Sequence, residues 1–254
     1  MDLNFKSFGN GPALIILHGL FGSLDNWVSH ARQLADSYSV YLLDQRNHGK
    51  SPHDDQWDYE TMADDLEAFM DQQGIYQAHL LGHSMGGKTV MQFAMHFPER
   101  IEKLIVADMA PKGYEPHHIE ILETLINIDL ANFENRQAVA AHMEASIPEM
   151  GVRQFLLKSL GRDGQKQFRW KFNLPVIYQN YPKILEPIEL AFPFDGPTLF
   201  LSGGKSNYVS PEEHELILEG FPEASFVVIP QAGHWLHADS PSEFLQEVRA
   251  FLAD

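Results

Sequence analysis

Short apolar runs alternate with amphipathic segments along most of this chain. The runs, each predicted to be a strand, cover residues 13–17, 39–44, 78–84, 101–108, 197–203 and 225–230. Their nearly continuous apolar character is typical of strands that are covered on both faces. Strands that alternate with helix-period segments indicate βαβ units. The pattern therefore predicts an α/β fold with a mostly parallel central sheet flanked by helices.

Helices are predicted where apolar residues recur at helical spacing, after Tyr59 and again over residues 85–97, where Pro98 follows. Two further helix starts are expected at Ser210 and Ser240. In both, proline follows the serine directly and glutamate stands three residues after it, which is typical of a capped helix N-terminus.

The strand pattern disappears from residue 112 to residue 194. Helix-like apolar faces replace it, followed by an aromatic-rich piece over residues 168–182, and the strands resume at Pro197. We therefore expect a core domain made of residues 1–111 and 195–254, with residues 112–194 inserted as a helical cap.

The composition fits one sizeable domain, because 44% of the 254 residues are hydrophobic. There is no cysteine, which excludes disulfides and a thiol nucleophile and suits a reducing compartment. No leader-like pattern opens the sequence, and no run approaches the roughly 20 apolar residues of a membrane span. We expect a cytoplasmic protein without stable membrane insertion; the sequence leaves the oligomeric state open.

The net charge of −17 argues against a nucleic-acid partner, which calls for a basic face. One segment, residues 151–171, is nevertheless basic. It contains Arg153, Lys158, Arg162, Lys166, Arg169 and Lys171 against Asp163 alone. A solvated helix surface is the favoured interpretation. The alternative is a site for the phosphates of a coenzyme A thioester.

A nucleophile is predicted at Ser84. The sequence 82-GHSMG-86 fits G-x-S-x-G at the junction of a predicted strand and helix, the context that this motif needs. The flanking glycines permit a sharp turn, since a Cβ there would collide with neighbouring backbone. The alternative is a tight turn with an incidental serine. A serine hydroxyl also requires a base and a group that orients the base.

His234 is the predicted base, because its glycine-preceded loop follows the last predicted strand and so lies at the same edge of the sheet as Ser84. His237 is the alternative. The two could also be metal ligands, but no third ligand stands at suitable spacing, so no metal or other cofactor is expected. His117, His118 and His142 are expected to be exposed.

An oxyanion hole is predicted from the backbone amides of Leu20 and Met85. Two glycines around Leu20 allow the chain to approach the nucleophile, and Met85 opens the helix after Ser84.

Four strings, 18-HGLFG-22, 44-DQRNHGKS-51, 82-GHSMGG-87 and 233-GHWLHADSP-241, resemble the α/β-hydrolase superfamily. Together with FLLKS and GGKSNYVS, they look like the YbfF-type bacterial esterases over nearly the whole chain. The resemblance implies a serine esterase acting on acyl esters or thioesters such as acyl-CoA, with Ser84 as nucleophile, His234 as base, and Leu20 and Met85 as oxyanion donors.

The acid is missing from the loop where most of the superfamily carries it. Counting back 28 residues from His234 reaches Ser206, and neither Ser206 nor Asn207 is acidic. Asp108, at the end of the strand next to that of Ser84, is the predicted substitute, and the YbfF-type pattern has its acid there. Asp195 and Asp239 are alternatives. Replacement of Ser206 or Asn207 is expected to matter little.

Asp44 also ends a predicted strand, but a structural role together with Arg46 is expected for it.

The sequence thus predicts a serine carboxylesterase or thioesterase with a small-molecule substrate. A C–C hydrolase or lyase on the same triad and a non-catalytic ligand-binding protein are the alternatives. Phe21, Trp235 and Tyr208 are expected to border the substrate. Four aromatic residues of the cap are candidates for an acyl pocket: Trp170, Phe172, Tyr178 and Tyr181. For such aromatic residues, packing in the core is the favoured interpretation.

Overall fold

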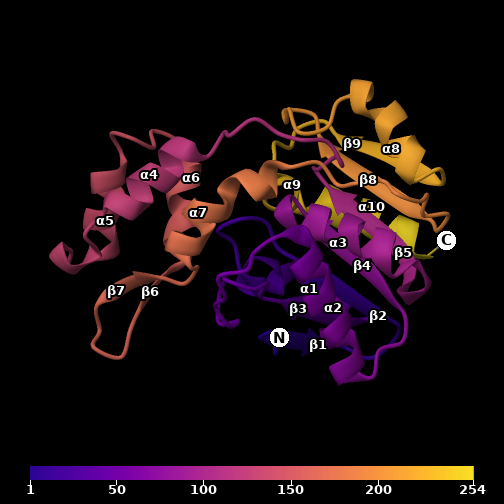
Figure 1. The fold of residues 1–254 in the computed structure, drawn as a ribbon, viewed down its shortest axis with the longest axis horizontal. Coiled ribbons are helices and arrows are strands. Elements are labelled where there is room, and N and C mark those ends of the chain that lie inside the picture. Colours follow the sequence, from indigo (N-terminus) through magenta and orange to yellow (C-terminus); the bar gives the residue numbers. More distant parts are fainter. Residues whose placement is uncertain (254) are drawn as a thin grey trace.

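A sheet of seven strands forms the centre of the molecule, whose residues 1–253 are described by a computed structural model (Figure 1). The strands lie in the order β1-β3-β2-β4-β5-β8-β9. They are β1 (Phe5–Phe8), β2 (Ala13–Leu17), β3 (Ser39–Leu43), β4 (Ala78–His83), β5 (Ile101–Ala107), β8 (Thr198–Gly203) and β9 (Ala224–Ile229). All neighbouring pairs except β1–β3 are parallel. The predicted strands are confirmed to within one residue at each end.

The sequence pattern missed β1, the strand that pairs antiparallel with β3 at the edge of the sheet. Three of its four residues are exposed, so it has no apolar run that would mark it as a buried strand.

Helices cover both faces of the sheet. On one face lie α1 (Val28–Leu34) and α10 (Pro241–Ala253), and on the other α2 (Tyr59–Gln73), α3 (Met85–His96) and α8 (His214–Gly220). Alternate residues of β2 serve the two cores: Leu14 and Ile16 pack with α1, and Ile15 and Leu17 with α2 and α3. This two-sided burial explains the continuous apolar runs of the central strands.

Short helical turns connect these elements. They are η1 (Leu24–Trp27), η2 (Pro98–Arg100), η3 (Leu130–Asn132), η4 (Pro211–Glu213) and the four-residue α9 (Leu236–Asp239). The helix predicted at Ser210 begins with the 3-10 turn η4, and the backbone N–H of Ser210 donates to Glu213 at 2.6 Å. The capping box predicted there is confirmed.

The inserted segment, residues 112–194, lies at the left in Figure 1, coloured from magenta to orange. It contains α4 (Ile119–Asn127), α5 (Arg136–Met143), α6 (Met150–Lys158), β6 (Leu160–Arg162), β7 (Phe168–Trp170) and α7 (Leu174–Leu185). The segment is mostly helical, but the sequence pattern missed β6 and β7, which form an antiparallel hairpin. Strands of three residues are too short to show periodicity. Its separation from the core as a cap domain stays a prediction.

Buried polar contacts join the inserted segment to the core. The Ser159 hydroxyl donates to the carbonyl of Phe21 at 2.7 Å, and the Tyr59 hydroxyl donates to the carbonyl of Ile184 at 2.9 Å. The inserted segment is thereby joined to the core at two points, just after α6 and near the end of α7.

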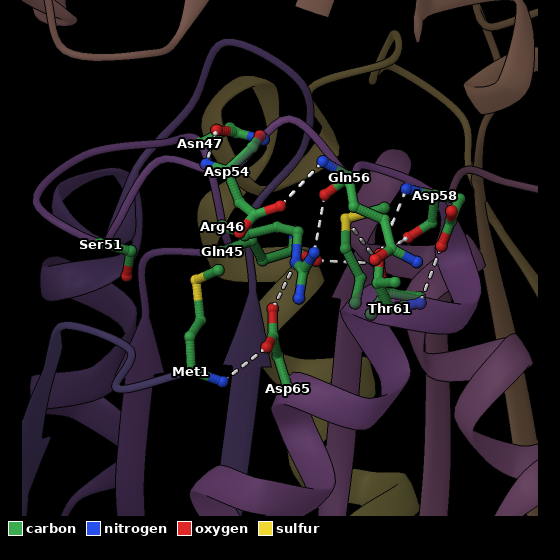
Figure 2. Close-up of polar contacts among 12 residues, drawn as sticks. Met1, Gln45, Arg46, Asn47, Ser51, Asp54, Gln56, Asp58, Thr61 and Asp65 are labelled. Atoms are coloured by element: carbon green, nitrogen blue, oxygen red, sulfur yellow. Dashed lines mark hydrogen bonds and ion pairs between the residues drawn. The ribbon is translucent and has the colours of Figure 1, made fainter. Parts of the chain in front are cut away.

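The loop after β3 is fixed by ion pairs and hydrogen bonds (Figure 2). Arg46 Nε lies 2.6 Å from Asp65 Oδ2, the Met1 amine lies 2.8 Å from Asp65 Oδ1, and Arg46 also donates to the carbonyl of Gln56. Asp44 accepts backbone N–H groups from Leu24 and Lys50. These contacts agree with the structural role expected for Asp44 and Arg46.

Within residues 1–253, no helix combines the length and the apolar character that crossing a bilayer requires.

Candidate functional site

The turn after β4 presents Ser84. This residue has φ 55° and ψ −118°, a conformation that side-chain-bearing residues rarely adopt. A Cβ at Gly82 would lie 2.1 Å from the carbonyl oxygen of Gly86, and a Cβ at Gly86 would lie 2.6 Å from that of Leu17. Close backbone approach therefore accounts for both glycines of the G-x-S-x-G motif.

The imidazole of His234 lies beside this serine. Its Nε2 is 3.0 Å from Ser84 Oγ, within hydrogen-bond distance. His234 stands in the loop between β9 and α9, so that the last parallel strand delivers it to the carboxyl edge of the sheet.

The other ring nitrogen of His234 meets Asp108. The Nδ1–H donates to Asp108 Oδ2 at 2.7 Å. Asp108 directly follows β5, has φ 51° and is fully buried. Ser84, His234 and Asp108 thus form one continuous hydrogen-bonded chain. The fixed Nδ1–H leaves Nε2 free to accept the proton of the serine hydroxyl.

The loop after β8 contributes to the same carboxylate. The Gly203 N–H donates to Asp108 Oδ1 at 3.0 Å, and the Ser206 hydroxyl donates to Asp108 Oδ2. The expectation that Ser206 is unimportant disregarded this contact, which joins residues 98 positions apart. Asn207 is exposed.

The alternative acids lie elsewhere. Asp195 is exposed, and Asp239 accepts the N–H of Gly233 at 2.9 Å, which fixes the backbone just before His234. The alternative base His237 is buried and stacks on Trp27, with ring centroids 4.2 Å apart.

His83, the residue before Ser84, supports the His234 loop. Burial lowers the pKa of His83 to about 3, so the ring is neutral at pH 7, and its Nε2–H donates to the carbonyl of His234 at 2.7 Å. Sequence reasoning treated this position only as the variable residue of the motif.

Two amides adjoin the serine. Leu20 follows the turn after β2, and Met85 is the first residue of α3, where helix N–H groups have no intrahelical acceptor. The hydrogen bonds within residues 1–253 include none from either amide. Both N–H groups are therefore free for a ligand.

Two cavities meet at Ser84. We call them the His234 cavity and the Tyr208 cavity, of which the second is the smaller. Phe21 and Trp235 line the first and Tyr208 lines the second, so all three expected border residues lie at the site.

Of the four cap aromatics, Tyr181 alone lines either of the two cavities at Ser84. Phe172 is buried and lies against Phe21, in agreement with the favoured interpretation of core packing. Trp170 stacks on Phe172, and Tyr178 is exposed.

His118, expected to be exposed, lines both cavities. Its Nδ1 lies 3.0 Å from the hydroxyl of Tyr181, and burial lowers its pKa to about 4. Only the docking of the inserted segment brings it to the site.

The basic segment, residues 151–171, does not form one solvated helix surface, so the favoured interpretation of it is wrong. Arg153 is buried and donates to the carbonyls of Ile147 and Pro148. Arg169 and Lys171 instead lie at the hairpin, where they line a separate cleft.

No group of three or more His, Asp or Glu side chains within residues 1–253 could hold a metal ion. The chemistry that the site offers is a hydroxyl beside an imidazole, a buried carboxylate and two backbone amides, which suits acyl transfer through the serine.

Comparison with known proteins gives the family. A model described as the alpha/beta hydrolase fold matches residues 12–141. "Esterase YbfF" of Escherichia coli (strain K12) is 41% identical over 246 residues, covering 96% of this chain and 94% of that protein. "sn-1-specific diacylglycerol lipase ABHD11" of Mus musculus is 38% identical and covers 95% and 81%. The solved structure of a "Marine microorganism esterase" has a TM-score of 0.96 at 43% identity, covering 98% and 99%.

The buried histidines predict loss of stability in mild acid. Burial lowers the pKa of His18 to about 4 and those of His48 and His83 to about 3. The unfolded chain binds protons at these residues below about pH 6.5, where the folded chain does not. As the pH falls from 6.5 to the pKa of the folded chain, which is about 4 for His18 and about 3 for His48 and His83, each should therefore lower the free energy of unfolding by up to about 1.4 kcal/mol per pH unit.

Urea unfolding at pH 8, 7, 6 and 5.5 measures this effect. The midpoint should fall as the pH drops below 6.5, because the unfolded chain then gains protons at these histidines. His48→Gln should reduce the pH dependence, and His117→Gln, at an exposed position, should leave it unchanged. A midpoint that stays constant down to pH 5.5 would contradict the assignment of neutral buried rings.

Proposed function

We propose that this chain, which belongs to the α/β-hydrolase fold family, is a serine esterase that cleaves carboxylic esters through an acyl-enzyme intermediate. Its esterase and lipase relatives support a hydrolase that acts on ester bonds. The use of a serine and an acyl-enzyme is supported by one observation. An unbroken hydrogen-bonded chain runs from Ser84 Oγ through His234 to Asp108, at the junction of two cavities.

In the first half-reaction, His234 Nε2 takes the proton of Ser84 Oγ while the oxygen attacks the acyl carbon. The imidazolium then gives this proton to the leaving oxygen as the bond between carbon and that oxygen breaks. In the second half-reaction, His234 deprotonates a water molecule that attacks the acyl-enzyme, and the serine leaves with the proton. Asp108 keeps Nδ1–H oriented and stabilises the transient imidazolium.

The amides of Leu20 and Met85 are proposed to receive the carbonyl oxygen. Charge develops on this oxygen when the tetrahedral intermediate forms, and preorganised donors stabilise it without reorganisation of solvent. The free N–H groups beside Ser84 support the assignment.

The triad is tested with a chromogenic ester. Ser84→Ala should abolish both the burst of p-nitrophenol and steady turnover of p-nitrophenyl acetate. Asp108→Asn should lower kcat at least about 100-fold, because the neutral amide no longer holds the required tautomer. Normal turnover by Asp108→Asn, with folding verified by circular dichroism, would refute the role of this acid.

Ser206 is proposed to position Asp108. Ser206→Ala removes one donor from a buried carboxylate and should lower kcat about tenfold while KM changes little. Asn207→Ala is the matched control in the same loop and should retain kcat to within about twofold. Equal kcat values for the two variants would exclude a contribution of the Ser206 hydroxyl.

A second substrate class, thioesters of coenzyme A, is favoured by a basic cleft. The cleft contains five basic side chains in a protein of net charge −17: Lys6, Lys50, Arg162, Arg169 and Lys171. Lys6 pairs with Asp25 at 2.6 Å. The cleft also includes residues 23–25 of the loop whose other residues line the His234 cavity. A coenzyme A thioester could thus place its phosphates in the cleft, follow this loop, and reach Ser84 with its thioester group.

Charge reversal tests this class. The double variant Arg169→Glu/Lys171→Glu should raise KM for acetyl-CoA about tenfold, since charged contacts to phosphate are lost, and leave KM for p-nitrophenyl acetate unchanged. Lys166→Glu, in the hairpin turn outside the cleft, is a charge-reversal control with half that change in charge and should leave both KM values unchanged. An equal change for both substrates would exclude a phosphate site.

A further inference from the structure

The two cavities that meet at Ser84 differ in which reacting groups they expose. Leu20, Ser84 and His118 border both cavities. His234 borders only the larger one, and Met85 borders only the smaller one. The base and one free amide beside the serine therefore face different spaces.

Tyr208 separates the base from the smaller cavity. Its ring is stacked on the imidazole of His234, with centroids 3.8 Å apart and planes inclined by 18°. Tyr208 lines the Tyr208 cavity, while His234 lines the His234 cavity. The phenol ring thus covers one face of the imidazole on the side of the Tyr208 cavity, while the imidazole borders the His234 cavity.

The position of Tyr208 is fixed by its backbone. Its carbonyl accepts the hydroxyl of Tyr114 at 2.8 Å, and its N–H donates to Ser206 Oγ at 3.3 Å. The ring of Tyr114 lies against that of Tyr208, with centroids 5.3 Å apart. The partition is therefore part of the site and not a mobile surface ring.

The chemistry of acyl transfer assigns a direction to each part of the substrate. The leaving oxygen or sulfur takes the proton from His234 Nε2 as its bond to the acyl carbon breaks, so it must lie in the space that His234 faces. The acyl carbon is bonded to Ser84 Oγ, and its chain must point elsewhere. The carbonyl oxygen lies near the Met85 amide, which borders the other space.

We propose that the acyl chain occupies the Tyr208 cavity, that the leaving group occupies the His234 cavity, and that Tyr208 keeps the two apart. The assignment rests on the proposed serine-esterase function.

The linings define the chemical class of each group. Met109, Ile184, Leu185 and tyrosine rings surround much of the Tyr208 cavity, and Glu115, His117 and His118 also line it. Within residues 1–253 neither lysine nor arginine lines it. Burial raises the pKa of Tyr208 to about 12, so its hydroxyl stays neutral. Without a cationic partner for a charged chain, this smaller cavity suits an uncharged acyl chain. The larger one, with Val152, Phe155 and Trp235, suits a bulkier apolar alcohol or thiol.

Two substrate series and two matched variants test the assignment. One series contains p-nitrophenyl esters of increasing acyl length, and the other contains acetate esters of increasingly bulky alcohols. Ile184→Phe fills the Tyr208 cavity and should lower kcat/KM for the octanoyl ester at least tenfold relative to the acetyl ester, with the alcohol series unchanged. Val152→Phe fills the His234 cavity and should impair only the bulky alcohols.

The opposite pairing, or an equal effect of either variant on both series, overturns the assignment. If Ile184→Phe does not fold, Ile184→Ala takes its place and should extend the accepted acyl length. Tyr208→Ala should join the two cavities. In that background, Ile184→Phe and Val152→Phe should each lower kcat/KM in both ester series.

A covalent adduct distinguishes failure of this assignment from failure of the proposed function. Ser84 Oγ should attack the phosphorus of a p-nitrophenyl octylphosphonate, form an O–P bond and release p-nitrophenolate. A crystal structure of the adduct should then place the octyl chain in the Tyr208 cavity. A chain in the His234 cavity overturns the assignment alone, whereas an unlabelled Ser84 together with absent ester turnover overturns both.

Discussion

The parallel register of β4 and β5 is the constraint on which the candidate site depends. His83 of β4 pairs with Ala107 of β5, so the next residues, Ser84 and Asp108, leave the sheet side by side. Both adopt positive φ, and both are tied to the neighbouring strand: the Ser84 N–H donates to the Ala107 carbonyl and the Asp108 N–H to the Leu201 carbonyl. Two strained turns are tolerated because the surrounding sheet determines their geometry. A single imidazole can then bridge the hydroxyl and the carboxylate.

Because the acid follows β5, the carboxylate and the groups that donate hydrogen bonds to it come from different segments of the chain. A carboxylate without solvent exposure is costly unless donors satisfy it, and Asp108 receives donors from Gly203, Ser206 and His234. Two of these donors come from the end of β8 and the loop after it, where most of the superfamily carries the acid. In this chain that region supplies hydrogen bonds to a charge at the end of the neighbouring strand, and through Tyr208 it also contacts the base.

Much of the arrangement was predictable because it rests on local patterns. The central strands, the turn at Ser84, the loop of His234 and the strand-end position of Asp108 each follow from apolar runs, glycines and the rule that parallel strands share one carboxyl edge. The edge strand β1 and the hairpin β6–β7 escaped prediction because short or exposed strands have no such pattern. The choice of Asp108 over Asp239 agreed with the geometry because only Asp108 ends the strand beside Ser84.

The sequence by itself determined the central parallel strands, the sharp turn at Ser84, and the strand-end positions of Ser84, Asp108 and His234 at the functional edge of the sheet. Only the tertiary structure decided that Ser206 donates to Asp108, that His118 enters the site, that Arg153 is buried and that Tyr208 divides the space around Ser84. The first group depends on neighbours along the chain. The second depends on contacts between segments far apart in sequence, whose side-chain directions are set when the inserted segment and the loops pack against the sheet.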